Sequence, residues 1–296
     1  MRPMTVQPLT VRPLSDALGA EVIGLDLKAP MPNDVVDALM GAWYENLVLV
    51  FRGQALTDEE HFRFTRQLGG LGHSPDQILT LDRAGQSEEA IRVKIGVISN
   101  IIRDGKPIGQ LGNDEVHWHT DSSFTAVPPA ASLLRAIEVP PVGGETYFMN
   151  MYRALETLPN ALRAAIRGRQ LKHDPTYTSA GVRRKEYADV TDPSQSPGPV
   201  HPIERLHPGS NRHALFLGRR QSSYVVGLPL AESEALLDQL WAHVLTQEGL
   251  VWGHTWQADD LVMWDNRCAM HRRGALDPNA PRHMRRTQLA GEVPVS

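Results

Sequence analysis

The order of strand-like and helix-like segments is the feature that most restricts the fold of this chain. Patterns typical of strands occur early, at residues 20–27 and 47–51, and again in the middle and near the end. Helical patterns lie between them at irregular intervals. A doubly wound parallel sheet needs regular alternation and is therefore not favoured. We predict a mixed α+β, mainly β fold, in which a β-sandwich or jelly roll is flanked by helices.

Local patterns predict the individual elements. Asn33 and Asp34 can cap a helix through about residue 44. Thr57 and Glu60 form a capping-box pattern for a helix to about residue 68, and a turn at 105–107 follows a strand at 97–100. Further strands are expected at residues 132–137, 146–149, 213–217, 251–256, 261–265 and 287–291, and further helices at 151–157, 160–167 and 231–247.

Composition and charge limit the organisation and the partners. The 296 residues contain no internal repeat and no linker between two cores, so we expect a single domain over residues 1–296. The formal net charge of −4 does not favour a nucleic-acid partner. The longest strongly apolar run, residues 47–51, is far shorter than the ~20 residues of a membrane span. Residues 1–9 lack a hydrophobic signal core and Cys268 is the single cysteine, so we expect a cytoplasmic protein.

The stretch Trp118-His119-Thr120-Asp121 carries the strongest chemical signal. Residues two apart in an extended segment point to the same face, so His119 and Asp121 can bind one metal ion together. Two histidines and one carboxylate on one side of a ferrous ion leave other positions open for a co-substrate and oxygen. We predict His271, which follows a strand running into a turn, as the third ligand.

Other histidines compete for the same role. His117 shares the face of His119 in an extended chain, and twelve histidines make a chance His-x-Asp match common. An ordinary hydrogen-bonded side chain is the default interpretation for the remaining candidates, His61, His173, His201, His243 and His254.

A longer pattern surrounds the His-x-Asp tripeptide. Its parts are Leu18-Gly19-Ala20-Glu21-Val22, Trp118-His119-Thr120-Asp121, Pro128-Pro129-Ala130, Gly143-Gly144-Glu145-Thr146, Trp264-Asp265-Asn266-Arg267, Arg282 and Arg286. Together they resemble the taurine dioxygenase / 2,4-dichlorophenoxyacetate dioxygenase family of Fe(II)/2-oxoglutarate-dependent oxygenases. The resemblance runs from about residue 8 to 291, nearly the whole chain.

This resemblance implies a double-stranded β-helix, or jelly roll, with Fe(II) held by His119, Asp121 and His271. It also implies that 2-oxoglutarate chelates the iron and that Arg282 and Thr146 bind its distal carboxylate. An arginine suits this task because its planar fork matches a carboxylate. Arg286 corresponds to an arginine that meets the acidic group of the primary substrate. Relatives are commonly dimers or tetramers, so a homo-oligomer is expected.

The implied reaction is oxidative decarboxylation of 2-oxoglutarate to succinate and CO2, with O2 as oxidant, coupled to hydroxylation of a small organic anion. The anion is a carboxylate or a sulfonate. Hydroxylation beside oxygen, nitrogen or sulfur can be followed by C–O, C–N or C–S cleavage. The family's halogenating relatives have a small residue where this chain has Asp121, which argues for hydroxylation. Two alternatives remain open at this point: a metal-dependent hydrolase on a jelly-roll scaffold, and a non-catalytic metal-binding sensor.

The substrate is less well defined by the sequence. His73 lies near the position of a substrate-contacting histidine in taurine-type enzymes, and an ordinary loop histidine is the alternative. An insertion between His73 and Asn100 departs from the taurine-type pattern, so a carboxylate is favoured over taurine. Residues 174–187 resemble a segment that covers an active site, with Tyr177, Arg183 and Arg184 as candidate contacts, or else a solvated loop.

Overall fold

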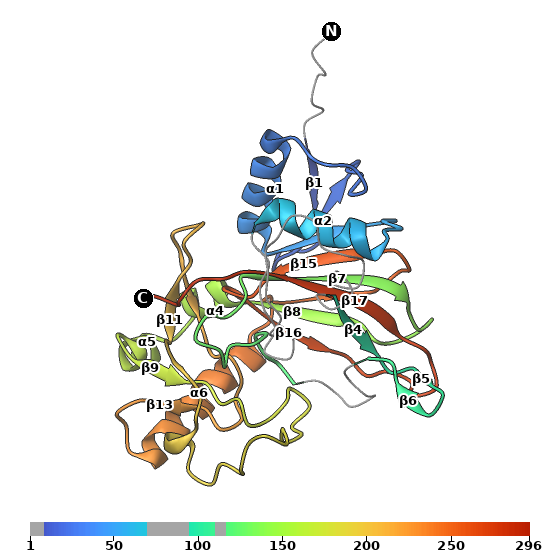
Figure 1. Cartoon of the computed structure of the whole chain (residues 1–296). Coiled ribbons are helices and arrows are strands. Elements are labelled where there is room, and N and C mark those ends of the chain that lie inside the picture. Colours follow the sequence, from blue (N-terminus) through green and yellow to red (C-terminus); the bar gives the residue numbers. More distant parts are fainter. Residues whose placement is uncertain (1–8, 70–94, 110–116) are drawn as a thin grey trace.

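The computed structural model describes residues 9–69, 95–109 and 117–296, and the described chain is mainly β with few helices (Figure 1). Its strands are β1 (Thr10–Pro13), β2 (Ala20–Ile23), β3 (Val48–Phe51), β4 (Gly96–Ser99), β5 (Ile102–Arg103), β6 (Lys106–Pro107), β7 (Ala131–Glu138), β8 (Thr146–Asn150), β9 (Gln170–Lys172), β10 (Val200–Pro202), β11 (Glu204–Leu206), β12 (His213–Leu215), β13 (Tyr224–Val225), β14 (Val251–His254), β15 (Leu261–Asp265), β16 (Ala269–Arg273) and β17 (His283–Leu289). Its helices are α1 (Asn33–Asn46), α2 (Asp58–Leu68), α4 (Met151–Glu156), α5 (Asn160–Ile166), α6 (Leu230–Thr246) and the short 3-10 helix η2 (Pro193–Gln195).

Two sheets form the centre of the described chain. The large sheet has seven strands in the order β1-β2-β3-β15-β7-β17-β4, and the small sheet has three in the order β14-β8-β16. All neighbouring pairs in these two sheets are antiparallel except β2 with β3. The rings of Phe148 in β8 and Trp264 in β15 lie 5.6 Å apart between centroids, so the two sheets pack against each other through aromatic side chains.

The large sheet is buried on both faces, and β3 shows why its sequence is apolar throughout. Val48 and Val50 belong to the core cluster shared with the small sheet, whereas Leu49 and Phe51 belong to a second cluster with α1 and α2. Successive side chains of a strand point to opposite faces. A strand covered on both sides therefore needs a continuous apolar run, and the prediction of a buried strand at 47–51 is confirmed.

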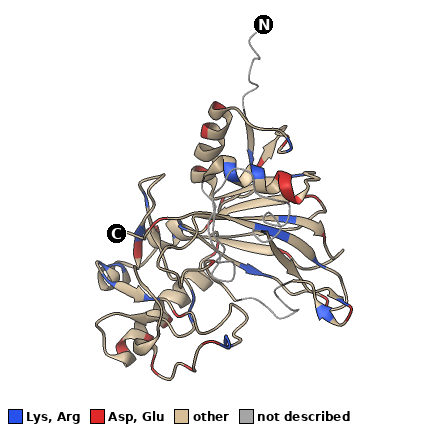
Figure 2. Ribbon diagram, viewed as in Figure 1, with Lys and Arg blue, Asp and Glu red and all other residues tan. Residues whose placement is uncertain are grey.

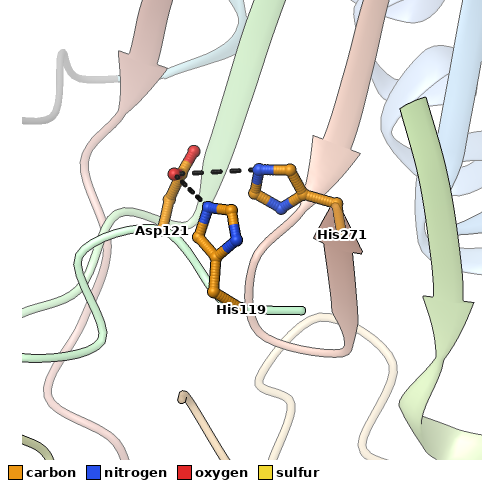
Figure 3. A group of neighbouring side chains, drawn as sticks. All are labelled: His119, Asp121 and His271. Atoms are coloured by element: carbon orange, nitrogen blue, oxygen red, sulfur yellow. Dashed lines mark ion pairs between the residues drawn. The ribbon is translucent and has the colours of Figure 1, made fainter. Parts of the chain in front are cut away.

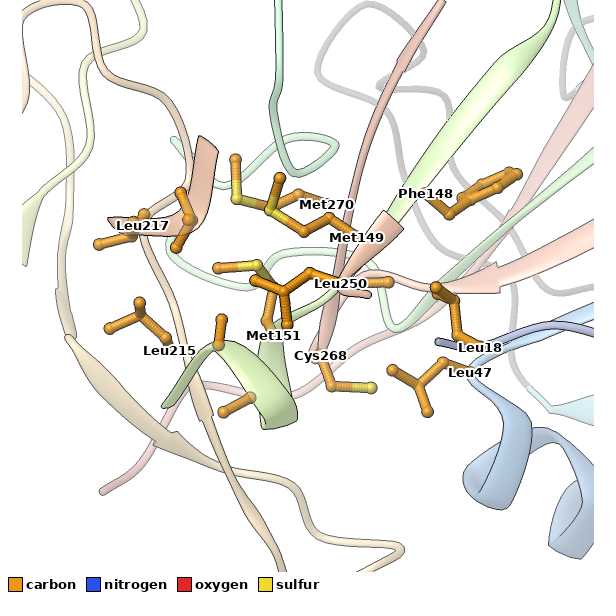
Figure 4. Packing of buried hydrophobic residues seen from close by; sticks show 14 of the residues in the cluster. Leu18, Leu47, Phe148, Met149, Met151, Leu215, Leu217, Leu250, Cys268 and Met270 are labelled. Carbon is orange, nitrogen blue, oxygen red and sulfur yellow. The ribbon is translucent and has the colours of Figure 1, made fainter. Parts of the chain in front are cut away.

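The small sheet has an apolar outer face and a partly polar inner face. Met149 and Met270 are cross-strand partners that pack on the outer face with residues of α4 and β12 (Figure 4). The next pair, Phe148 and His271, points inward toward Trp264 of the large sheet. His271 is thus brought between the sheets by the same alternation that buries the methionines.

The helices agree with the predictions except in one cap. The capping box is present, because Thr57 Oγ1 accepts from Glu60 N at 3.1 Å and Glu60 Oε2 accepts from Thr57 N at 2.7 Å. Helix α1 instead begins after Pro32 with no side-chain cap, so the expected Asn33-Asp34 cap is wrong. Proline presets the backbone angle φ for a chain entering a helix. No helix among the described residues has the length and apolarity needed to cross a bilayer.

Three strand predictions need correction. The turn expected at 105–107 lies at residues 104–105, and Lys106–Pro107 is already the returning strand β6. Strand β17 begins at His283, not at residue 287, and β16 was not predicted as a strand of its own. The start of β17 and the whole of β16 were missed for the same reason. Polar side chains such as Arg273 and Arg286 lie on inward faces of these strands, where an apolar pattern is expected.

Candidate metal centre and its surroundings

His119, Asp121 and His271 come together between the two sheets (Figure 3). Their candidate ligand atoms all lie within 4.8 Å of one another, and each side chain is buried. Asp121 Oδ1 is 3.7 Å from His119 Nε2 and 3.8 Å from His271 Nε2. The structure therefore brings together the three residues that the sequence proposed as one metal site.

The backbone fixes the two histidines relative to each other. His119 N donates to His271 O at 3.0 Å, and His271 N donates to His119 O at 2.9 Å. This two-way bridge places the imidazole rings 4.2 Å apart between centroids. Asp121 follows two residues after His119, so its side chain returns to the same side.

The protonation states of the three groups suit a divalent cation. His119 Nδ1 lies 2.8 Å from the carbonyl oxygen of His117, which can only accept, so the lone pair is on Nε2. Burial and the neighbouring His119 lower the pKa of His271 to about 3. Burial acts to raise the pKa of Asp121, but Arg286 and the two imidazoles outweigh it and bring that pKa well below its usual range. The site offers two imidazole nitrogens and one carboxylate, a donor set that fits Fe(II).

A hydrogen-bonded chain that starts at Ser132 in β7 and continues to the end of β15 and to β17 holds the carboxylate of Asp121. Ser132 Oγ donates to Asp121 Oδ2 at 2.6 Å. Ser132 Oγ itself accepts from Asn266 Nδ2 and from Gln288 Nε2, each at 3.1 Å. Trp264 Nε1 in turn donates to Asn266 Oδ1 at 3.0 Å. Because Oδ2 is occupied, Oδ1 is the oxygen left to face the two histidines.

Arg286 and Arg285 project from opposite faces of β17. Arg286 Nη1 lies 3.5 Å from Asp121 Oδ1, beside the metal-binding cluster. Arg285 Nε lies 3.2 Å from Asp58 Oδ2 of α2, on the outer face of the large sheet. This is the arrangement expected from strand alternation, in which Arg286 faces inward and Arg285 points away.

Arg282 is a buried cation beside a second cation, Arg273. Burial, and then the positive charge of Arg273, lower the pKa of Arg282 to about 9, and no acidic group among the described residues offsets either effect. Its Nε has no hydrogen-bond partner among the described residues. Arg273 is the cross-strand partner of Thr146, so the three residues lie in one region. The buried guanidinium of Arg282, beside a second positive charge, is a place for an anion.

Strand alternation alone does not relate the side chain of Arg282 to that of Arg286. Arg282 precedes β17, and the strand has a register shift between His283 and Met284. Strict alternation therefore does not extend back to Arg282. Its backbone is held instead by Asn100, whose Oδ1 accepts from Arg282 N at 2.8 Å.

Trp256 is a neighbour of Thr146 that the sequence analysis missed. Its indole Nε1 donates to Thr146 Oγ1 at 3.0 Å, and both side chains are buried. An indole N–H can only donate. The Thr146 oxygen thus acts as an acceptor here, which leaves its own hydrogen available for an anion. No local sequence signal identifies this contact, because the two residues are 110 positions apart.

The competing candidates have other positions. The side chain of His117 is exposed. Another buried group, formed by His207, Asp265 and Cys268, also has metal-ligand composition. However, His207 Nδ1 accepts from two backbone N–H groups, so Nε2 donates to Asp265 Oδ2 at 2.9 Å. Arg267 Nη2 also binds that oxygen, at 2.6 Å. With both ring nitrogens engaged, this group is a structural network rather than a metal site.

Of the candidate substrate contacts, Tyr177, Arg183 and Arg184 lie within the described residues. His73 lies outside the described residues. Arg183 is exposed and lies 3.0 Å from Asp189, whereas the guanidinium of Arg184 stacks over the ring of Phe124 at 4.9 Å. Tyr177 forms an isolated β-bridge with Arg183.

Comparison with known proteins agrees with this geometry. The family model "Taurine catabolism dioxygenase TauD, TfdA family" matches residues 10–288. The alpha-ketoglutarate-dependent 2,4-dichlorophenoxyacetate dioxygenase of Cupriavidus pinatubonensis is 34% identical over 97% of this chain and 99% of that protein. The alpha-ketoglutarate-dependent sulfate ester dioxygenase of Pseudomonas putida is 32% identical over 97% and 91%. The crystal structure of AAD-2 in complex with Mn(II) and N-oxalylglycine superposes with a TM-score of 0.78 and 30% identity, covering 98% of this chain and 100% of that one.

Proposed function

This chain belongs to the TauD, TfdA family of Fe(II)- and 2-oxoglutarate-dependent dioxygenases, and on that premise we propose that His119, Asp121 and His271 are its iron ligands. The observation that carries the proposal is the convergence of their ligand atoms within 4.8 Å. The orientation of His119 by the His117 carbonyl and of Asp121 by Ser132 supports it. Such outer partners commonly fix the direction of metal ligands.

We propose that Arg282 and Thr146 bind the distal carboxylate of 2-oxoglutarate. The buried charge of Arg282, next to Arg273, calls for an anionic partner. Thr146 can donate its hydroxyl hydrogen because Trp256 occupies its oxygen as a donor. When iron and 2-oxoglutarate are bound, they supply an oxidant from O2, with release of succinate and CO2, and the substrate is hydroxylated.

We propose that Arg286 receives the acidic group of the primary substrate. Its guanidinium lies 3.5 Å from Asp121 Oδ1, so an anion bound there would lie next to the metal. The relatives named for 2,4-dichlorophenoxyacetate and for sulfate esters support a small organic anion. Within this range we favour a carboxylate, whose hydroxylation beside an ether oxygen would be followed by C–O cleavage. His73 remains a candidate contact by its sequence position.

We further propose the finer structural assignments. The facing large and small sheets, with the candidate site between them, support a double-stranded β-helix, or jelly roll. One core cluster joins both sheets with α4 and α6, which supports a single catalytic domain over residues 1–296. A homo-oligomer and a cytoplasmic location are proposed from the sequence resemblance and composition.

The test is the substitution Asp121→Ala. We expect it to abolish succinate formation and the weak visible charge-transfer band of an anaerobic Fe(II)–2-oxoglutarate complex. The hydrolase alternative predicts no such band and has no need for Arg282 or Thr146, whereas the sensor alternative predicts no succinate release with any substrate. Normal turnover in the variant would refute the ligand assignment. A panel of small acids, scored by coupled succinate release, would then identify the substrate.

A further inference from the structure

Arg219 is a half-buried cation near the metal-binding cluster that neither the iron nor the 2-oxoglutarate assignment uses. It follows Gly218, whose carbonyl accepts from Thr120 N at 2.9 Å, so the segment lies directly beside the His119–Asp121 stretch. Gly218 has a φ of +63°, and a side chain there would collide with His173. The backbone turn that positions Arg219 thus depends on glycine.

The guanidinium of Arg219 is poorly compensated. One nitrogen, Nη1, donates to the carbonyl oxygen of Tyr177, and the buried Nε has no hydrogen-bond partner among the described residues. Burial and then the positive charge of Arg184 lower its pKa to about 10, while Asp174 and Asp121 act in the opposite direction. Asp174 is already engaged, because its carboxylate accepts from Thr176 and Ser196.

Arg219 and Arg184 both lie over the ring of Phe124. The guanidinium of Arg184 lies 4.9 Å from the centre of the Phe124 ring, and that of Arg219 lies 5.6 Å from the same ring. The three side chains are half-buried. Basic and acidic residues are interspersed over the rest of the ribbon (Figure 2). Two arginines thus share one aromatic ring near a site that already has Arg286.

Arg286 and Arg219 lie on different elements near the metal-binding cluster. Arg286 comes from β17 and touches Asp121 Oδ1 at 3.5 Å. Arg219 comes from the segment after β12 and influences the same carboxylate only through its charge. An anion on Arg286 would lie at the metal, whereas one on Arg219 would lie against Phe124, away from the reacting centre.

We propose that Arg219, with Arg184 and Phe124, forms a second anion-binding subsite for the primary substrate, which therefore carries a second acidic group beyond the one at Arg286. This inference rests on the proposed function, because it presumes that Arg286 binds the first acidic group. The aromatic ring between the arginines fits a substrate whose two acidic groups are joined by a flat or apolar spacer.

Adjacent arginines provide a matched control. Arg220 follows Arg219 directly, but it binds Glu234 Oε2 and Asp238 Oδ1 of α6, each at 2.7 Å. Phenoxyacetate and its 3- and 4-carboxy derivatives are matched acids with one and two negative groups. The measurement is kcat/KM for coupled succinate release, together with the melting temperature of the Fe(II)- and 2-oxoglutarate-loaded protein under argon with each acid.

We expect the wild-type protein to prefer a dicarboxylate over phenoxyacetate, and Arg219→Gln to reduce that preference about tenfold, as for loss of a charge-assisted contact. Arg219→Lys should retain part of it and Arg220→Gln all of it. No preference in the wild type, or an equal loss for both kinds of acid in Arg219→Gln, would overturn the subsite. Failure of every acid to release succinate would instead contradict the proposed reaction, and the melting temperatures would still test the subsite.

Discussion

Ser132 donates a 2.6 Å hydrogen bond to the carboxylate oxygen of Asp121 that faces away from the two histidines. Its oxygen has both acceptor positions filled, by Asn266 and Gln288. The hydroxyl hydrogen therefore has one available direction, toward Asp121. This contact engages Asp121 Oδ2 and so leaves Oδ1 to face the two histidines.

Removal of this hydroxyl should weaken iron binding without removing a ligand. We expect Ser132→Ala to reduce Fe(II) affinity about 10- to 100-fold, as for other outer partners of metal ligands. The Fe(II) affinity is measured by anaerobic titration with Fe(II) in the presence of 2-oxoglutarate, with the charge-transfer band as the signal. Ser233→Ala is the control, since Ser233 is an equally buried serine whose Oγ accepts from Val225 N far from the site. Equal Fe(II) affinity in the two variants would contradict the role of Ser132.

His117 and His119 are a matched pair for testing the ligand assignment. They are two residues apart, but the His119 side chain is buried in the cluster and that of His117 is exposed. We expect His119→Ala to eliminate the charge-transfer band and His117→Ala to retain it, because the latter keeps the backbone carbonyl that orients His119. If His117→Ala lost the band and His119→Ala kept it, His117 would be the ligand and the assignment of His119 would be wrong.

The convergence of His119, Asp121 and His271 could be predicted from the sequence because these residues have local or chemical signatures. His119 and Asp121 share a face by strand periodicity, and β3 and β15 have apolar patterns that a buried sheet requires. Strand β16, which carries His271, was not recognised, because His271 and Arg273 put polar groups on a buried face. Polar residues inside a sheet are explained only by the site that they serve.

Contacts between residues far apart in the sequence could not be predicted, for a different reason. A buried serine such as Ser132 is unremarkable in a strand, and its importance depends on which residues the register sets opposite. Gln288 is its partner in β17 and Trp264 its partner in β15. Pairing of strands that are far apart in sequence is not encoded in any single segment.

Substitution of Arg282, in the loop before β17, and of Arg286, in β17, should affect the binding of different compounds. We expect Arg282→Ala to raise KM for 2-oxoglutarate at least about tenfold, because it removes a charge-assisted contact to a carboxylate. Arg286→Ala should act mainly on the primary substrate. Arg285→Ala serves as the control, since Arg285 binds Asp58 on the outer face. Steady-state kinetics with each compound varied would reveal an error if Arg282→Ala and Arg286→Ala affected both compounds equally.

Trp256 should act as a positioning residue for the co-substrate. Trp256→Phe keeps a large ring in the core but removes the N–H that binds Thr146 Oγ1. We expect KM for 2-oxoglutarate to rise several-fold with a smaller change in kcat, since one neutral hydrogen bond contributes about 1 kcal/mol. In Thr146→Val the same substitution should add little, because its partner is gone. Full additivity of the two effects on KM would show that Trp256 acts through packing alone.

His61 should make the protein sensitive to acid. His61 belongs to α2, and its fully buried side chain faces β17, with Nε2 3.0 Å from Thr287 Oγ1. Burial, and then the charge of Arg135, lower its pKa from 6.5 to about 3. Between these values the unfolded chain binds a proton that the folded protein does not, so the free energy of unfolding falls as the pH falls through that window. His61 alone should contribute a slope of up to about 1.4 kcal/mol per pH unit.

Urea unfolding at several pH values between 4 and 7, in the presence of a chelator, would measure this slope. The chelator removes any contribution from metal release at His119 and His271. We expect His61→Gln to flatten the pH dependence, because glutamine can still hydrogen-bond to Thr287 but does not titrate. His213→Gln is the control, since the side chain of His213 is exposed. An unchanged slope in His61→Gln would mean that the folded protein accommodates the protonated ring, in conflict with its complete burial.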